Sequence, residues 1–202
     1  MTLRALTPAL ALSLVLGLSA CEPADPAATA EAAEPAAAEP AAPTATAALP
    51  GLLVEADGIT PAQPGGGTAL KLSFGQFMNE VIGPLAQVCG GAPAEITRNT
   101  ECGAGPLEFA SWDDGLQLVL QEGRFVGWWL DQAAPETYST VRDVHIGSTL
   151  RELRAAYPDV EIRDESIGPE FTTAEGLSGT LSGTTDDARI TNLYAGVSCI
   201  FR

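Results

Sequence analysis

Histidine, cysteine and positive charge are scarce in this chain of 202 residues. The single histidine, His145, leaves little room for catalysis or metal binding by imidazole groups. Four cysteines are too few for a small domain held together mainly by disulfides. Ten basic residues are outnumbered by 26 acidic ones, and no stretch clusters Lys and Arg. Nucleic acids and anionic lipid heads are therefore poor candidate partners.

The first twenty residues have the layout of a secretory signal peptide. Arg4 supplies a positive start, and the apolar run from Ala5 to Leu18 is too short to span a bilayer comfortably. The residues "LSAC", ending at Cys21, resemble the lipobox of bacterial lipoproteins, whose cysteine is acylated after cleavage just before it. The resemblance predicts a signal peptide over residues 1–20 and acyl chains on Cys21. The alternative is an ordinary secretory signal in which Cys21 is merely a thiol near the cleavage site.

Residues 21–50 consist almost wholly of Ala, Pro, Glu and Thr, with five acids, no base and no aromatic residue. Such a composition cannot build a core, so it predicts a disordered tether that reaches up to about 90 Å when extended. Acyl chains on Cys21 would anchor the protein in a membrane of the cell envelope. Glu22 follows the cysteine, in place of the aspartate that resembles the inner-membrane retention signal. This favours the outer membrane, on the side facing the periplasm.

Residues 51–202 are enough for one domain with a core of its own, and they carry nine basic and 21 acidic residues. An internal duplication organises this part of the chain. "LSFGQFMNEVI" from Leu72 resembles "VHIGSTLRELR" from Val144, and "GPLEF" is echoed by a later "GPEF". "GRFVGWWL" from Gly123 is matched by "ARITNLYA" from Ala188. Three matches in the same order indicate two related copies.

Each copy predicts a helix followed by antiparallel strands. In the second copy, Thr149 and Glu152 have the spacing of a capping box at a helix start. Turn-rich segments of alternating polarity follow each helix and are typical of strands. We therefore expect an α+β domain of two tandem helix-plus-antiparallel-strand repeats, with copies at about 70–131 and 138–202 and with the helices on one face of the sheet.

The glycine-led helix starts, Gly75 to Val81 and Gly147 to Leu153, and the late segment "VLQEGRFVGWWL" resemble a known family. They are similar to the β-lactamase inhibitor protein fold and to its relatives among small envelope lipoproteins, including the outer-membrane β-barrel assembly family. The resemblance implies shape rather than chemistry, and it carries no inhibitory residue onto this chain.

Three cysteines remain after Cys21, so one is left unpaired once a disulfide forms in an oxidising compartment. The resemblance favours a bridge between Cys89 and Cys102, which would close the loop after the first helix as disulfides do in the inhibitor fold. The rival pairing joins Cys102 to Cys199 and ties the last strand to the first copy.

No motif for catalysis or for a cofactor emerges. His145 precedes a predicted helix, and nothing in the sequence places a nucleophile and a carboxylate beside it. Two pairs of acidic residues lack the alternating ligand spacing of a calcium loop and are expected in turns. These are Asp113 with Asp114, and Asp186 with Asp187. Gly65 to Gly67 are not followed by the GK[ST] residues of a phosphate-binding loop. The expectation is a non-enzyme without metal or cofactor.

Trp128 and Trp129 are adjacent in a predicted strand, so their side chains point to opposite faces of the sheet. One ring is expected in the core, and the other is either shielded by loops or exposed as a contact for a partner. The partner-binding surface would then be the sheet face opposite the helices, with Leu118 or Leu120 adding apolar area.

These features predict a lipid-anchored envelope protein that acts as a non-catalytic protein-binding module. The alternative is a structural or assembly lipoprotein of the outer membrane with no discrete ligand. Negative charge from residues such as Glu122 and Asp131 favours a basic or neutral partner.

Overall fold

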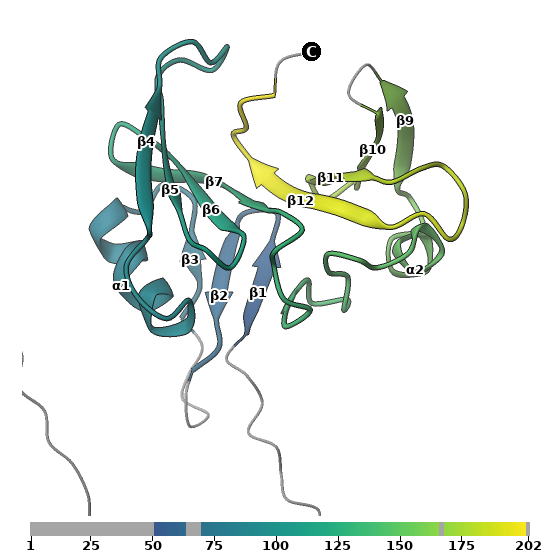
Figure 1. Ribbon diagram of the computed structural model, residues 1–202, viewed down its shortest axis with the longest axis horizontal. Helices are drawn as coiled ribbons and strands as arrows, with labels where there is room; N and C mark the ends of the chain where they lie inside the picture. The colour runs from purple at the N-terminus through teal and green to yellow at the C-terminus, as the bar shows by residue number, and fades with distance from the viewer. Residues whose placement is uncertain (1–50, 64–69, 166–167, 201–202) are drawn as a thin grey trace, which may run out of the picture. The chain divides into compact units, whose positions relative to one another are not determined.

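The computed structural model describes residues 51–63, 70–165 and 168–200 (Figure 1). The predicted signal peptide (1–20), the tether (21–50) and Cys21 lie outside the described residues, as do Gly65 to Gly67. The predictions made for them stay predictions.

A small sheet opens the described part of the chain, with the strand order β3-β2-β1-β8. Strands β1 and β2 are joined by a tight turn and pair antiparallel, whereas β8 pairs parallel with β1. Leu52 and Val54 on β1 are buried while Leu53 between them is exposed, as the two-residue period of a strand requires. The strands are β1 (Leu52–Glu55), β2 (Gly58–Pro61), β3 (Leu72–Ser73) and β8 (Tyr138–Ser139).

A larger sheet of eight strands follows, with the order β4-β5-β6-β7-β12-β11-β10-β9 and antiparallel pairing throughout. Strands β7 and β12 join its two halves (Figure 1). The first half is β4 (Glu95–Asn99), β5 (Leu107–Ser111), β6 (Leu116–Gln121) and β7 (Arg124–Leu130). The second half is β9 (Glu161–Glu165), β10 (Gly168–Thr172), β11 (Leu177–Leu181) and β12 (Ile190–Gly196).

Two helices occur in the described part of the chain, α1 (Met78–Val88) and α2 (Leu150–Ala156). The predicted capping box of the second helix is confirmed, because Thr149 Oγ1 accepts from the Glu152 amide and the Glu152 carboxylate accepts from the Thr149 amide. Each helix buries the apolar residues on one side, such as Leu85 on α1 and Leu153 on α2.

The main core lies between one face of the larger sheet, the smaller sheet and the two helices. Trp128 and Phe125 of β7 are among its largest fully buried side chains. The Trp128 indole N–H donates to the Glu55 carbonyl at 2.8 Å, so the ring also ties β7 to β1. Burial of a polar N–H requires such a partner.

The predicted fold class is wrong. The domain is mostly β, with two sheets of four and eight strands and helices of only eleven and seven residues, rather than two helix-plus-strand repeats. The physical reason is that segments 52–61, 72–73 and 138–139 pair with one another and form a second sheet, which the two-repeat pattern did not include. Their contacts are distant in sequence, so local periodicity does not reveal them.

The two glycine-led segments nevertheless share local geometry. Gly75 and Gly147 have φ angles of +92° and +91°, and each N–H donates to a strand carbonyl, that of Phe125 and that of Ile190. Each glycine carbonyl accepts from an arginine, Arg124 for Gly75 and Arg189 for Gly147. A positive φ favours glycine because it has no Cβ.

The disulfide joins Cys102 to Cys199, so the favoured Cys89–Cys102 pairing is wrong and the rival pairing forms. Cys89 directly follows α1 and packs against the main core, whereas Cys102 belongs to a second, small core with Leu107 and Val119. The side chains of Cys89 and Cys102 therefore pack against different cores, although the two residues are close together in the sequence.

Replacing both Cys102 and Cys199 by Ala should lower the free energy of unfolding by about 2–5 kcal/mol, because the bridge closes a long loop in the unfolded chain. Urea denaturation monitored by tryptophan fluorescence measures this change. Cys89→Ala is the control, since it removes a thiol and no cross-link. Equal midpoints for the double variant and the unmodified protein would show that the bridge contributes nothing.

Candidate functional site

The larger sheet has a second face, which points away from the main core and which we call the outward face. The side chains of Trp128 and Trp129 lie on opposite faces of the sheet, as predicted for adjacent strand residues. Trp128 is 1% exposed within the main core, whereas Trp129 is half-buried on the outward face. The sheet therefore leaves one of the two rings available on the surface.

Trp129 stacks on Tyr194 of the neighbouring strand β12, with ring centroids 4.6 Å apart and planes within 8°. The Trp129 indole N–H donates to Asn192 Oδ1 at 3.2 Å, and Asn192 in turn donates to Thr180 Oγ1 at 2.8 Å. The Tyr194 hydroxyl donates to the buried carboxylate of Glu170 at 3.4 Å. These bonds hold the aromatic pair in a defined orientation at the centre of the outward face.

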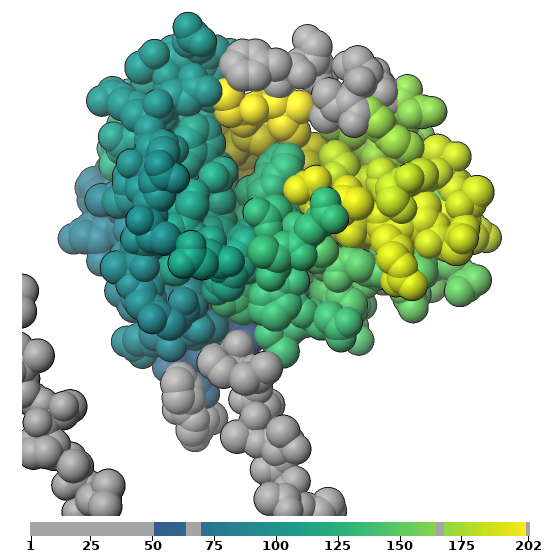
Figure 2. Space-filling model, viewed as in Figure 1, coloured from purple at the N-terminus to yellow at the C-terminus, as the bar shows by residue number. Residues whose placement is uncertain are grey.

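A hollow of about 390 Å³ adjoins this aromatic pair. Phe109, Gln117 and Trp129 line it from the sheet, and residues 198–200 line it from the C-terminal segment. The disulfide to Cys102 holds that segment, which therefore forms a fixed wall of the hollow. In the space-filling view, residues from the C-terminal end lie between the first half of the larger sheet and strands β9 and β10 (Figure 2).

The prediction that Leu118 or Leu120 adds apolar area to this face is wrong, because both are fully buried in the main core. The register explains this, since Leu118 lies opposite Trp128 while Gln117 lies opposite Trp129. The polar amide of Gln117, rather than a leucine side chain, therefore lies beside Trp129 on the outward face.

Tyr194 was not identified from the sequence, although a signal for it existed. In the match between "GRFVGWWL" and "ARITNLYA", Tyr194 aligns with Trp129. The same two residues are directly opposite in the β7–β12 ladder. The acidic residues Glu122 and Asp131 flank β7 at its two ends, in turns, rather than on the outward face.

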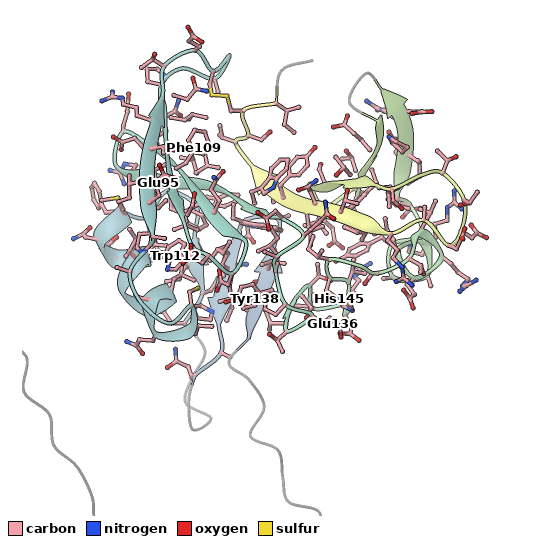
Figure 3. The ribbon with its side chains drawn as sticks, in the orientation of Figure 1. Glu95, Phe109, Trp112, Glu136, Tyr138 and His145 are labelled. Carbon is pink, nitrogen blue, oxygen red and sulfur yellow. A yellow bond between two sulfur atoms is a disulfide. The ribbon has the colours of Figure 1, made fainter. Side chains whose placement is uncertain are left out.

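His145 and Asp186, considered above for catalysis and for calcium, lie apart from the outward face. His145 is half-buried, and its Nδ1 lies 2.8 Å from the Ile146 carbonyl oxygen (Figure 3). Asp186 pairs with Arg154. Within the described ranges, no three His, Cys, Asp or Glu residues gather in a group that holds a metal ion.

Asp113 and Asp114 lie in a turn, as predicted, and Asp114 also takes part in a partly buried contact with Tyr138 of β8. Its carboxylate accepts from the Tyr138 hydroxyl at 2.5 Å, and that hydroxyl also lies 3.6 Å from Cys89 Sγ. Burial, and then the nearby Asp114 charge, raise the pKa of the Cys89 thiol to about 12. The thiol is therefore protonated near neutral pH and is a poor nucleophile.

Comparisons with protein-family models, with curated proteins and with solved structures found no match. Neither of the described helices has the length and apolar character needed to cross a membrane.

The two tryptophans should differ in their contribution to stability. Trp128→Ala should lower the free energy of unfolding by about 3–5 kcal/mol, as a large core truncation does. Trp129→Ala should cost about 1 kcal/mol, the size of a lost aromatic pair. Urea denaturation of both variants measures the difference. Equal losses would mean that both rings belong to cores.

Proposed function

We propose that this protein is a lipid-anchored cell-envelope protein that acts as a non-catalytic protein-binding module through the outward face. The observation that carries the proposal is the stacked pair of Trp129 and Tyr194 beside a hollow of about 390 Å³. Aromatic anchors that adjoin a pocket are typical of the energetically dominant parts of protein interfaces.

The fixed orientation of the aromatic pair supports a role in partner binding. Trp129 is held by its stack and by the hydrogen bond to Asn192, so its orientation exists before a partner arrives. A side chain that is already ordered loses little conformational entropy on binding. The main core covers the opposite face of the sheet, whereas the small core around Leu107 and Val119 covers only part of the outward face and leaves Trp129 half-buried.

The proposed membrane anchor comes from the residues "LSAC" and from the Ala/Pro/Glu-rich stretch after them. Acyl chains on Cys21 would hold the protein at the membrane, and the tether would let the domain reach a partner at a distance. A periplasm-facing position in the outer membrane agrees with Glu22 after the cysteine and with the disulfide, which persists in oxidising compartments.

Cys21→Ser should abolish incorporation of labelled palmitate and move the protein from the membrane to the soluble fraction, because no acyl chain can then be attached. Fractionation of cells that express either form, followed by detection of the label, measures both effects. Cys89→Ser serves as the control for the loss of one thiol. Unchanged labelling together with unchanged membrane retention would refute the anchor.

Trp129→Ala should reduce capture of a partner at least tenfold while the domain stays folded, because truncation removes the more accessible ring of the pair. The measurement is cross-linking and pull-down of the full chain from detergent-solubilised membranes, quantified for each co-purified protein. Phe77→Ala is the matched control, since Phe77 is an exposed aromatic residue outside the larger sheet.

One stoichiometric protein lost only with Trp129→Ala supports the binding module. Broad co-purification with outer-membrane assembly proteins, equal for both variants, would instead favour a structural or assembly lipoprotein with no discrete ligand.

A further inference from the structure

A continuous line of residues crosses the first half of the outward face. The strand registers place Glu95 opposite Ser111, Ser111 opposite Gln117, and Gln117 opposite Trp129. Directly opposed residues in antiparallel strands have their side chains on the same face of the sheet. The line therefore runs from the edge strand β4 to the centre of the sheet. Figure 3 shows Glu95 on this outer part of the first half.

The second half continues the same line to the other edge. Trp129 lies opposite Tyr194, Tyr194 opposite Ser178, Ser178 opposite Thr172, and Thr172 opposite Glu161 on β9. We call the eight residues from Glu95 to Glu161 the cross-strand row. All of them except Tyr194 are half-buried or exposed.

The row has the same order of chemical groups when read from either end. A carboxylate stands on each edge strand, and a hydrogen-bonded polar pair follows on each side. Gln117 Nε2 donates to Ser111 Oγ at 3.0 Å, and the hydroxyls of Thr172 and Ser178 are 3.2 Å apart. The aromatic pair occupies the centre. Because the polar pairs bond to each other, the aromatic centre and the two carboxylates are the groups best able to contact a partner.

Each end of the row carries an exposed carboxylate, that of Glu95 on β4 and that of Glu161 on β9. Among the described residues, Glu95 takes part in none of the ion pairs. Glu161 pairs with Arg163 at 2.9 Å, and the buried Glu170 lies opposite Arg163 on β10. The Glu161–Arg163 pair is mostly exposed, and such a pair is weak enough to be exchanged for a partner's base.

We propose, resting on the function above, that the outward face recognises a protein segment with an apolar or aromatic centre and a positive charge on each side, laid across the strands along the cross-strand row. Seven spacings between eight strands amount to about 34 Å along the sheet. An extended segment of about ten residues covers that length. A second copy of the chain is a poor occupant, because it would bring acidic ends against acidic ends.

The test uses the full chain, purified in non-ionic detergent, and two dye-labelled peptides of about ten residues, a length set by the strand spacing. Both peptides have the same central aromatic and aliphatic residues and the same four lysines. One peptide divides the lysines between its two ends, and the other has all four at one end. Fluorescence anisotropy gives the dissociation constant of each.

The divided peptide should bind about three- to tenfold more tightly, the gain expected from one additional exposed ion pair or two. Glu95→Gln combined with Glu161→Gln should remove this preference. Glu122→Gln combined with Glu136→Gln is the matched control, since it removes the same charge from exposed residues off the row and should retain the preference. Trp129→Ala should weaken both peptides equally.

The outcomes separate the two proposals. If both peptides bind equally and still depend on Trp129, the charge pattern is overturned while the binding face stands. The same holds if the control pair removes the preference as fully as the row variants do. If neither peptide binds, or if Trp129→Ala changes nothing, the recognition proposed here and the use of the outward face for binding are both overturned.

Discussion

The pairing of β7 with β12 is the constraint on which the rest of the domain depends. It joins the two halves of the larger sheet, and it requires glycine where the end of β12 lies beside the middle of β7. A Cβ on Gly127 would lie 2.3 Å from the Val197 carbonyl oxygen, and one on Gly196 would lie 2.3 Å from that of Val126. Gly196 also has a φ of +77°. No larger residue fits this approach without a backbone shift.

The same pairing determines both faces of the sheet. Trp128 is buried in the main core and bonded to β1, while Trp129 meets Tyr194 on the outward face. The inner ring therefore links the two sheets, and the outer ring forms the centre of the proposed binding surface. Successive side chains of a strand alternate between the two faces of the sheet. For this reason Trp128 contributes to stability, while its neighbour Trp129 belongs to the proposed binding surface.

The disulfide adds a second link between the ends of the domain. By joining Cys102 to Cys199 it holds the C-terminal segment against strands of the first half, beside the aromatic pair. The hollow next to Trp129 thus depends on a cross-link across 97 residues of sequence. The half-buried Cys89 accepts a hydrogen bond from the Tyr138 hydroxyl near the main core and takes no part in the disulfide.

Local patterns in the sequence determined the capping box at Thr149 and the division of the two tryptophans between the faces of the sheet, because each depends on a few neighbouring residues. Tertiary structure alone decided that the domain is mostly β, that Cys102 pairs with Cys199 and that Gln117 rather than Leu118 lies beside Trp129. Sheet order, strand register and disulfide partners are set by contacts between segments that are distant in the sequence, and local periodicity does not indicate which segments pair.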